Sequence, residues 1–371
     1  SKSCLFGQCS SGGGSESCDD GNPCTEDTCS ATGCAHAEIE NCCGNGVVEF
    51  GEECDDGNLA DLDGCSGCYI AESLVAHGSY IEEASVFATG DGEISVAWSD
   101  WDTWGPQAAR LGSDGMTDWT TDEWLSSTDK LHDSGVVNVV SRSGEGMVVS
   151  WFYDIRGSTE RTGVYGRRIL EDGTLDASFN ACPVSNHNYT NPGATTIQSD
   201  GTVWFTWYAN ESSVVAGSRF GFDGESQGGT LTVESTTTSY LYVPAVASLA
   251  DDRIVFAWVR NSRVVDVQEI DARILAKDAS SSGNTIVVST GSARVFNPQV
   301  AGLTGGGFAV VFDNKIADIP GVYARTYDSS SNPTGLEFQV NRSSIGSAAS
   351  PSLAALPNGG FVVVWADYPA E

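Results

Sequence analysis

Positive charge is scarce in this chain. Its 371 residues include 18 Lys and Arg, only four of them Lys, against 50 Asp and Glu, so the formal net charge is −32. A surface of that sign repels polyanions, and we therefore expect no nucleic-acid partner. No run of 18 apolar residues is present, which excludes an ordinary membrane-spanning helix and predicts no direct membrane insertion.

Common catalytic motifs are lacking as well. The four histidines (His36, His77, His132 and His187) have no recognisable partner in the sequence, and GxSxG, HExxH and P-loop patterns are not found. Two carboxylates across a sugar would suffice for a glycosidase, but 50 acids produce such pairs by chance. We therefore expect no enzyme activity and predict no catalytic residue.

Cysteine is unevenly distributed. Eleven of the 12 cysteines precede residue 69, and the first 75 residues combine 15 acids with one base, a net charge of −14. This segment has little periodic apolar pattern, so it needs disulfides, metal or both in place of a core. We expect a secreted or cell-surface protein, because the chain also starts at Ser1 without a signal-peptide pattern, like a processed protein. The cysteines are Cys4, Cys9, Cys18, Cys24, Cys29, Cys34, Cys42, Cys43, Cys54, Cys65, Cys68 and Cys182.

The odd number of N-terminal cysteines leaves one without a local partner. It bonds Cys182, bonds another molecule, or stays free, and spacing alone does not decide how the others pair. Cys65 and Cys68 have the CxxC spacing of redox and zinc sites, but no βαβ context or second ligand pair accompanies them. We interpret them as halves of structural disulfides.

Residues 43–68, with the pieces CGNG, GEECDDGN and DGCS, resemble the cysteine-rich repeat of secreted and surface proteins of myxobacteria and other bacteria. Phe50 stands where proline is common in that repeat, and the last cysteine pair is one residue tighter. Residues 18–36 are similar to another cysteine-rich repeat of the same kind of protein. The resemblance implies secretion and modular organisation, and we expect cysteine-rich modules at 1–42 and 43–70.

Both modules contain the sequence DDGN, whose oxygen-bearing side chains in a tight turn suit calcium. The alternative is that Asp, Gly and Asn simply form turns and cap their own backbone. Calcium is the one cofactor that the sequence suggests. The candidate ligands are Asp19, Asp20, Asn22, Asp55, Asp56, Asn58, Asp61 and Asp63.

The rest of the chain repeats. Six apolar runs end in an aromatic residue, at intervals of 53, 56, 51, 54 and 53 residues. A Gly- or Asp-rich turn and another apolar stretch precede each run, which predicts a hairpin. The aromatic residues are Trp98, Trp151, Trp207, Trp258, Phe312 and Trp365.

Two further apolar stretches follow in most repeats. Four strands in about 53 residues, with almost no helical periodicity, predict an all-β fold: a six-repeat β-propeller over residues 71–371. Residues 306–341 resemble the propeller-type repeats of large secreted bacterial proteins, which implies fold and export. One arginine per repeat favours a repeated brace to Asp or to backbone over an anion site. These arginines are Arg110, Arg168, Arg219, Arg273 and Arg325.

The sixth repeat is incomplete. It contains its inner hairpin, residues 350–366, but the chain ends at Glu371 before a third and fourth strand. We expect residues 72–76 to supply the outer strand of the last blade and close the ring. One strand position then remains, so an unfilled edge would accept a strand from another copy and build a filament.

The first repeat is rich in tryptophan. Indoles beside carboxylates suit sugar rings, although the same residues could fill an interface. The candidate carbohydrate-binding residues are Trp101, Asp102, Trp104, Trp119 and Trp124, and the sequons that could carry glycans are at Asn188, Asn210 and Asn341.

Two functions compete on this evidence. The first is a secreted, non-enzymatic structural or adhesive protein, such as a filament subunit, whose partners are its own copies or cell-surface and matrix material. The second is a carbohydrate-binding or carbohydrate-cleaving propeller that uses the Trp-rich first blade. The incomplete sixth repeat favours the first.

Overall fold

A computed structural model describes the chain in segments, and every element in them is a β-strand. No helix in these segments is long and apolar enough to cross a membrane. The chain forms two compact units, residues 1–76 with 111–118, and residues 77–110 with 119–371. The described segments are 3–5, 8–10, 15–18, 25–30, 33–39, 65–66, 69–70, 81–100, 105–112, 117–121, 137–153, 163–181, 190–209, 213–265, 267–280, 283–289, 294–315, 320–341 and 346–369.

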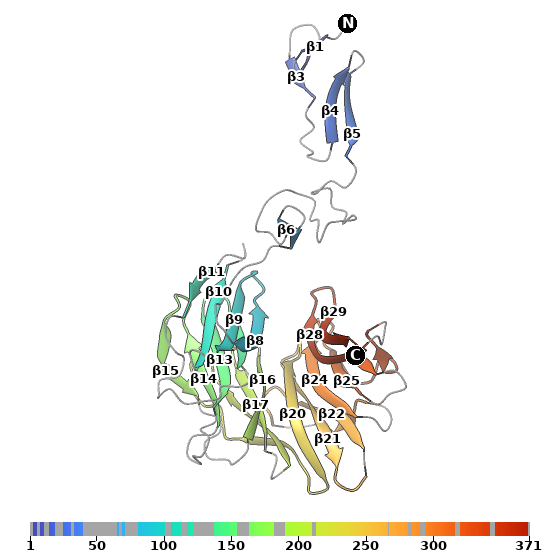
Figure 1. The fold of residues 1–371 in the computed structure, drawn as a ribbon. Coiled ribbons are helices and arrows are strands. Elements are labelled where there is room, and N and C mark those ends of the chain that lie inside the picture. The colour runs from blue at the N-terminus through green and yellow to red at the C-terminus, as the bar shows by residue number, and fades with distance from the viewer. Residues whose placement is uncertain are drawn as a thin grey trace. The chain divides into compact units, whose positions relative to one another are not determined.

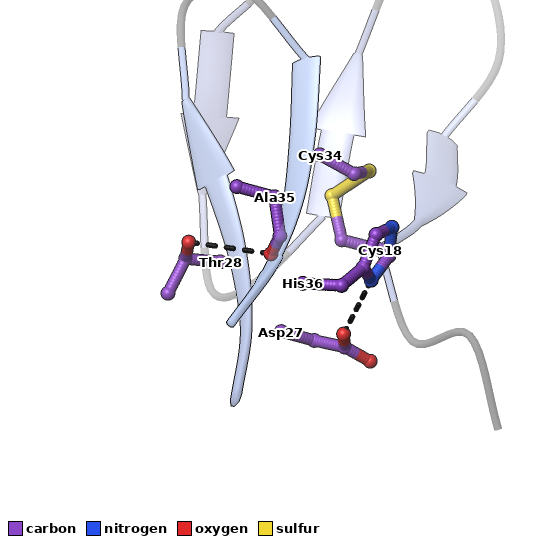
Figure 2. Close-up of a disulfide and its surroundings, with 6 residues drawn as sticks. All are labelled: Cys18, Asp27, Thr28, Cys34, Ala35 and His36. Atoms are coloured by element: carbon purple, nitrogen blue, oxygen red, sulfur yellow. Dashed lines mark hydrogen bonds and ion pairs between the residues drawn. A yellow bond between two sulfur atoms is a disulfide. The ribbon is translucent and has the colours of Figure 1, made fainter. Parts of the chain in front are cut away.

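The first unit contains short antiparallel hairpins. A disulfide joins Cys18 to Cys34, and Cys18 is only 3% exposed, which confirms one of the expected disulfides (Figure 2). His36 has a partner that the sequence did not reveal, since its Nδ1 lies 2.5 Å from Asp27 Oδ1. Cys182 lies outside the described residues, and Cys18–Cys34 is the pairing that the structure describes. The strands are β1 Ser3–Leu5, β2 Gln8–Ser10, β3 Ser15–Ser17, β4 Thr25–Ser30, β5 Gly33–Glu38, β6 Cys65–Ser66 and β7 Tyr69–Ile70.

The second unit repeats one antiparallel sheet, which we call a blade (Figure 1). Blades one to five each have four strands that pair in chain order, so the first strand lies at one side of its sheet and the fourth at the other. The strands are β8 Ile81–Ala88, β9 Ile94–Asp100, β10 Gly105–Leu111 and β11 Thr117–Thr120 in blade one; β12 Val137–Arg142, β13 Gly146–Tyr153, β14 Gly163–Ile169 and β15 Leu175–Ala181 in blade two; β16 Thr190–Ile197, β17 Val203–Ala209, β18 Val214–Phe220 and β19 Leu231–Ser235 in blade three; β20 Ser239–Ser248, β21 Ile254–Ser262, β22 Gln268–Leu275 and β23 Ile286–Val287 in blade four; and β24 Val295–Gly302, β25 Phe308–Asn314, β26 Gly321–Tyr327 and β27 Phe338–Gln339 in blade five.

The core lies between neighbouring blades. Phe308, Val310 and Phe312 of blade five pack with Val255 and Ile270 of blade four in one apolar cluster. Because both faces of a second strand are covered in this way, these strands are continuous apolar runs rather than alternating ones. Blades three and four share a second cluster of the same kind.

The repeated arginines act as the predicted brace. Each guanidinium donates a hydrogen bond to a backbone carbonyl, and three of the bonds cross from one blade to its neighbour. The donor and acceptor residues are Arg110 with Glu171, Arg168 with Glu145, Arg219 with Gln227, Arg273 with Val233, and Arg325 with Val288.

The sixth repeat is shorter than the others. Its sheet in the described residues has two strands, β28 Gly346–Ala355 and β29 Phe361–Pro369, as the sequence predicts. Trp365 is 37% exposed, whereas the equivalent aromatic residues of the other blades are at most 5% exposed. The proposed closing strand, residues 72–76, lies outside the described residues. The fold is therefore all-β and propeller-like, and closure of six blades is not established.

Candidate functional site

Each blade has two edges that differ in chemistry. An edge is the end of a blade where its strands begin or finish. The turn edge is the end where a tight turn joins the first two strands, as at residues 249–253. The start edge is the opposite end, where the first strand begins. At the turn edge Gly201 has φ +89° and Gly306 has φ +82°, a conformation that glycine adopts readily. The start edge of blade four brings together acids, tyrosines and an arginine, and it is the candidate site.

The predicted sugar site in blade one is mostly beyond the described residues, since Trp101, Asp102, Trp104 and Trp124 all lie outside them. Trp119 is described: its indole Nε1 donates to the Glu171 carbonyl at 3.1 Å and its ring lies 3.0 Å from the position of a Cβ on Gly173. This tryptophan therefore packs on blade two.

The remaining predicted sites divide similarly. All eight candidate calcium ligands and the sequons at Asn188 and Asn210 lie outside the described residues. Asn341 is only 5% exposed, and its Oδ1 accepts the Val322 N–H at 2.8 Å. Asn341 is therefore buried in the folded chain, and its use as a glycan acceptor stays a prediction.

Asp271 occupies an unusual position on β22. It lies opposite Trp258 in the register, where the third strands of other blades place Tyr165, Ala216 and Tyr323 opposite their own aromatic residue. Its side chain is 1% exposed. Burial raises the pKa of Asp271 to about 7, and the Arg260 guanidinium opposes that rise.

Arg260 joins two carboxylates. Its Nε lies 3.0 Å from Asp271 Oδ2, and its Nη2 lies 3.1 Å from Asp271 Oδ1 and 3.2 Å from Glu269 Oε2. Arg260 and Glu269 are each about one third exposed. One buried and one accessible carboxyl therefore share a single guanidinium. We call Arg260, Asp271 and Glu269 the Arg260 triad.

Aromatic and amide groups lie on the same edge. The Tyr208 and Tyr242 rings are 6.5 Å apart, and Gln268 Nε2 donates to the Tyr242 hydroxyl at 2.8 Å. Burial raises the pKa of both tyrosines. Gln268 Oε1 and Trp258 Nε1 are buried without a hydrogen-bond partner among the described residues. Such atoms normally find water or a ligand.

The first strands bulge at this level. Val243, Asn297 and Ser350 have φ between +49° and +54°, and each precedes a proline opposite the blade's aromatic residue. A β-branched residue such as Val243 is strained there, and bulges often re-aim side chains beside sites.

Blade five carries a second buried acid. Asn297 Nδ2 donates to Asp313 Oδ1 at 2.9 Å, while Asp313 Oδ2 has no hydrogen-bond partner among the described residues. Asp313 is fully buried, and burial raises its pKa.

The turn edge offers clefts of a different kind. One of about 380 Å³ is lined by Glu145, Arg168, Glu171 and Asp172, and Arg168 is already held by the Glu145 carbonyl at 2.9 Å. Hydrogen bonds from Thr174 lower the pKa of Asp172. Glu145 and Glu171 form ion pairs with Arg142 and Arg110, so each carboxylate of this cleft has a partner.

Comparison with known proteins agrees with the two-part organisation. A family described as the Dictyostelium (slime mold) repeat matches residues 17–39, which supports a cysteine-rich repeat but not specifically the myxobacterial one. No curated protein is significantly similar in sequence. The repeat and the Cys18–Cys34 disulfide are consistent with an extracellular protein.

The blades resemble solved glycosidases. An α-L-arabinanase of Penicillium chrysogenum has a TM-score of 0.55 at 10% identity, over 77% of this chain and 89% of that chain. An α-L-arabinofuranosidase of Fusarium graminearum has a TM-score of 0.54 at 10% identity, over 77% and 88%. A Dyadobacter fermentans protein of unknown function has a TM-score of 0.52 at 10% identity, over 78% and 91%. At this identity the likeness shows a shared fold.

These comparisons correct the functional expectation. The prediction of a non-enzymatic structural, adhesive or filament protein is wrong, because solved chains sharing this fold over three quarters of the sequence are arabinanases and arabinofuranosidases. They agree better with the second candidate, a carbohydrate-active propeller.

The sequence did not reveal the Arg260 triad, because the chain has 50 acidic residues and composition does not distinguish Glu269 and Asp271 from the others. One signal was available: the third strands of blades four and five contain the equivalent triplets Asp271-Ala272-Arg273 and Tyr323-Ala324-Arg325. An acid in an aromatic position, inside a strand expected to be buried, marks a candidate site.

Proposed function

We propose that this protein binds and hydrolyses a glycan, with the Arg260 triad at the centre of its site. The observation that carries the proposal is the buried Asp271 carboxyl, whose pKa rises to about 7 beside the accessible carboxylate of Glu269. In glycosidase sites unlike environments set the pKa values of neighbouring acids apart, and here the buried Asp271 would keep its proton so that the Arg260 guanidinium serves the ionised Glu269. The fold shared with arabinose-releasing enzymes supports arabinofuranosyl glycans as first substrates.

The accessible groups would contact the sugar. Glu269 supplies the carboxylate at the reacting bond, Arg260 orients it and binds hydroxyl groups, and Tyr242 provides an apolar ring face. Asp271 is buried behind them and is a positioning residue. While Asp271 is protonated, the Arg260 guanidinium forms an ion pair with Glu269 alone. Once Asp271 ionises, the two carboxylates compete for that guanidinium.

Hydrolysis of arabinan tests the proposal. Glu269→Gln should lower kcat by at least about 100-fold, the usual contribution of acid–base groups. Glu225→Gln, an exposed turn-edge change of the same chemistry, is the matched control and should retain wild-type activity. Wild-type activity in Glu269→Gln would contradict the proposed role, as would the absence of hydrolysis and binding of arabinan and arabinobiose by the wild type.

The pH profile tests Asp271 separately. Activity should fall as pH rises through about 7, where Asp271 ionises. Asp271→Asn should shift that limb to higher pH, because the amide stays neutral. A variant that only loses stability, with an unchanged profile, would leave Asp271 a purely structural residue.

We also propose that Trp101 and Trp104 stack on sugar rings beside the reacting unit. In the sequence these two indoles flank Asp102, and indole rings beside a carboxylate suit sugar faces and hydroxyl groups. Trp101→Ala and Trp104→Ala should each weaken arabinan binding without changing kcat for a small chromogenic arabinoside. Unchanged affinity in both variants would contradict this role.

We propose further that blades one and six close the ring. Each of these two blades has exposed valines on the face opposite its other neighbour, which is blade two for blade one and blade five for blade six. Val86 on β8 is 67% exposed, and Val362 and Val364 on β29 are 46% and 61% exposed. Val86→Cys with Val364→Cys should form a disulfide seen by peptide mapping. Val86→Cys with Val265→Cys, a valine of blade four, should not. Failure of the first pair to link would argue against closure.

Secretion and calcium binding by the N-terminal modules are proposed on the cysteine content and the two DDGN sequences. Chelation should then lower the melting temperature of the full chain, and added calcium should restore it. A melting curve that does not respond to chelator would remove calcium from the proposal.

A further inference from the structure

Blades four and five carry the same cation–aromatic pair at their start edges. The Arg263 guanidinium lies 4.2 Å from the Tyr240 ring centroid, and Lys315 Nζ lies 4.9 Å from the Phe296 centroid. Tyr240 is 46% exposed, and Arg263 and Lys315 are exposed. We call the four residues of these two pairs together the cationic patch: Tyr240, Arg263, Phe296 and Lys315.

The pairs occupy equivalent positions. Each cation directly follows the second strand of its blade, and each aromatic is the second residue of the first strand. The backbone N–H of Arg263 donates to the Thr238 carbonyl and that of Lys315 to the Arg294 carbonyl, both at 2.9 Å. The same backbone geometry therefore presents a cation twice, on adjacent blades.

Neither cation is neutralised by an ion pair within the described segments. Arg263 is steadied by the Ser213 hydroxyl at 2.8 Å. Among the described residues, the acid near Lys315 is Asp313, which is fully buried and accepts from Asn297; the Lys315 charge opposes the rise in its pKa that burial causes. Ion pairs occupy most other described cations, namely Arg110, Arg142, Arg168, Arg253, Arg260, Arg273 and Lys277.

We infer that the cationic patch binds an anionic unit of the glycan, a carboxylate or sulfate on a sugar near the cleaved bond. The inference rests on the proposed function, since the patch shares the start edge with the Arg260 triad. Two exposed positive charges on a chain of net charge −32 attract an anion locally, while the remaining surface repels a long polyanion. The ligand is therefore a short oligosaccharide, or a chain end, with few charges.

Calorimetry on the full chain tests this with three probes: trigalacturonic acid, a sulfated disaccharide and neutral arabinotriose. Trigalacturonic acid or the sulfated sugar should bind more tightly than arabinotriose, and whichever does identifies the anion. That advantage should shrink when salt rises from 0.05 to about 0.5 M, as screening requires. Arg263→Gln with Lys315→Gln should weaken the acidic probe at least about 10-fold and leave arabinotriose unchanged.

Arg253→Gln, at the turn edge, is the control and should bind like the wild type. Equal affinity for acidic and neutral probes, or loss of arabinotriose binding in the double variant, would overturn the anion site while the glycan function stands. Absence of binding by all three probes would overturn both.

Discussion

The two edges of the blades treat their carboxylates in opposite ways. At the turn edge, hydrogen bonds from Ser143 and Thr89 lower the pKa of Asp91 to about 2, and similar bonds lower that of Asp172. At the start edge, burial raises the pKa of Asp271 to about 7 and also raises that of Asp313. The acids of the turn edge take part in the turns, whereas the two acids of the start edge are buried inside strands.

The difference has a simple cause. A turn places N–H and O–H donors within two residues of the acid, so the carboxylate is satisfied by its own turn, as Asp172 is by the backbone N–H and the hydroxyl of Thr174. An acid inside a strand has no such neighbours, and its environment is set by the strands around it, as Arg260 of the paired strand does for Asp271. Perturbed acids of the second kind point to function more strongly than those of the first.

Removing the partner of a buried acid should have the largest effect. Arg260→Met strands the Asp271 charge and should lower the free energy of unfolding by about 3–5 kcal/mol near pH 8. Arg253→Met, which frees the exposed Asp251 at the turn edge, should change it by less than about 1 kcal/mol. Urea denaturation of both variants gives the comparison. Equal losses of unfolding free energy in the two variants would contradict the difference between the edges.

The pH dependence of stability should differ between the edges. Asp271 has a folded pKa of about 7 against 3.8 for an unperturbed Asp, so the folded state binds the extra proton between those values. Its stabilisation is complete below about pH 4 and is lost as pH rises through 7, with a slope of at most about 1.4 kcal/mol per pH unit.

For Asp91 the sign reverses. Its pKa is lowered to about 2, so its contribution is present above pH 3.8 and disappears as pH falls through 2. Asp271→Asn should flatten the neutral slope, and Asp91→Asn should flatten the acid slope. Free energies of unfolding between pH 2 and 8 would measure both, and a neutral slope that survives Asp271→Asn would contradict the raised pKa.

Removing the turn-edge hydrogen bonds of Asp252 should have the smallest effect on stability. Asp252 accepts from Ser199 and Lys277 and has φ +63° where the equivalent turns have glycine. Asp252→Ala loses these bonds but keeps the strained conformation, and it should destabilise by about 1 kcal/mol. Asp251→Ala, one residue away, is the control. If thermal melts showed Asp251→Ala to be less stable than Asp252→Ala, the hydrogen bonds of Asp252 would not contribute to stability.

Much of the architecture could be predicted because it is local. The 53-residue period, the hairpins, the shortened sixth repeat and the arginine brace all follow from patterns within one repeat, and the structure contains each of them. The Cys18–Cys34 bond was expected as one of many pairings, since composition demands disulfides without choosing partners.

The site could not be predicted in the same way. Tyr208 of blade three meets Tyr242 of blade four across 34 residues, and neither sequence position indicates the contact. Trp119 was assigned to a sugar site, but its indole packs on blade two. The prediction of no enzyme relied on motifs, and glycosidase-type acids need no fixed spacing in the chain.

By itself, then, the sequence determined the strands, their period and the need for disulfides, because these depend on side chains a few residues apart. The tertiary structure alone decided which of 50 acids matter. Asp271 is an ordinary aspartate until the neighbouring strands remove its water and place Arg260 beside it, and desolvation of that kind is a property of the assembled blades.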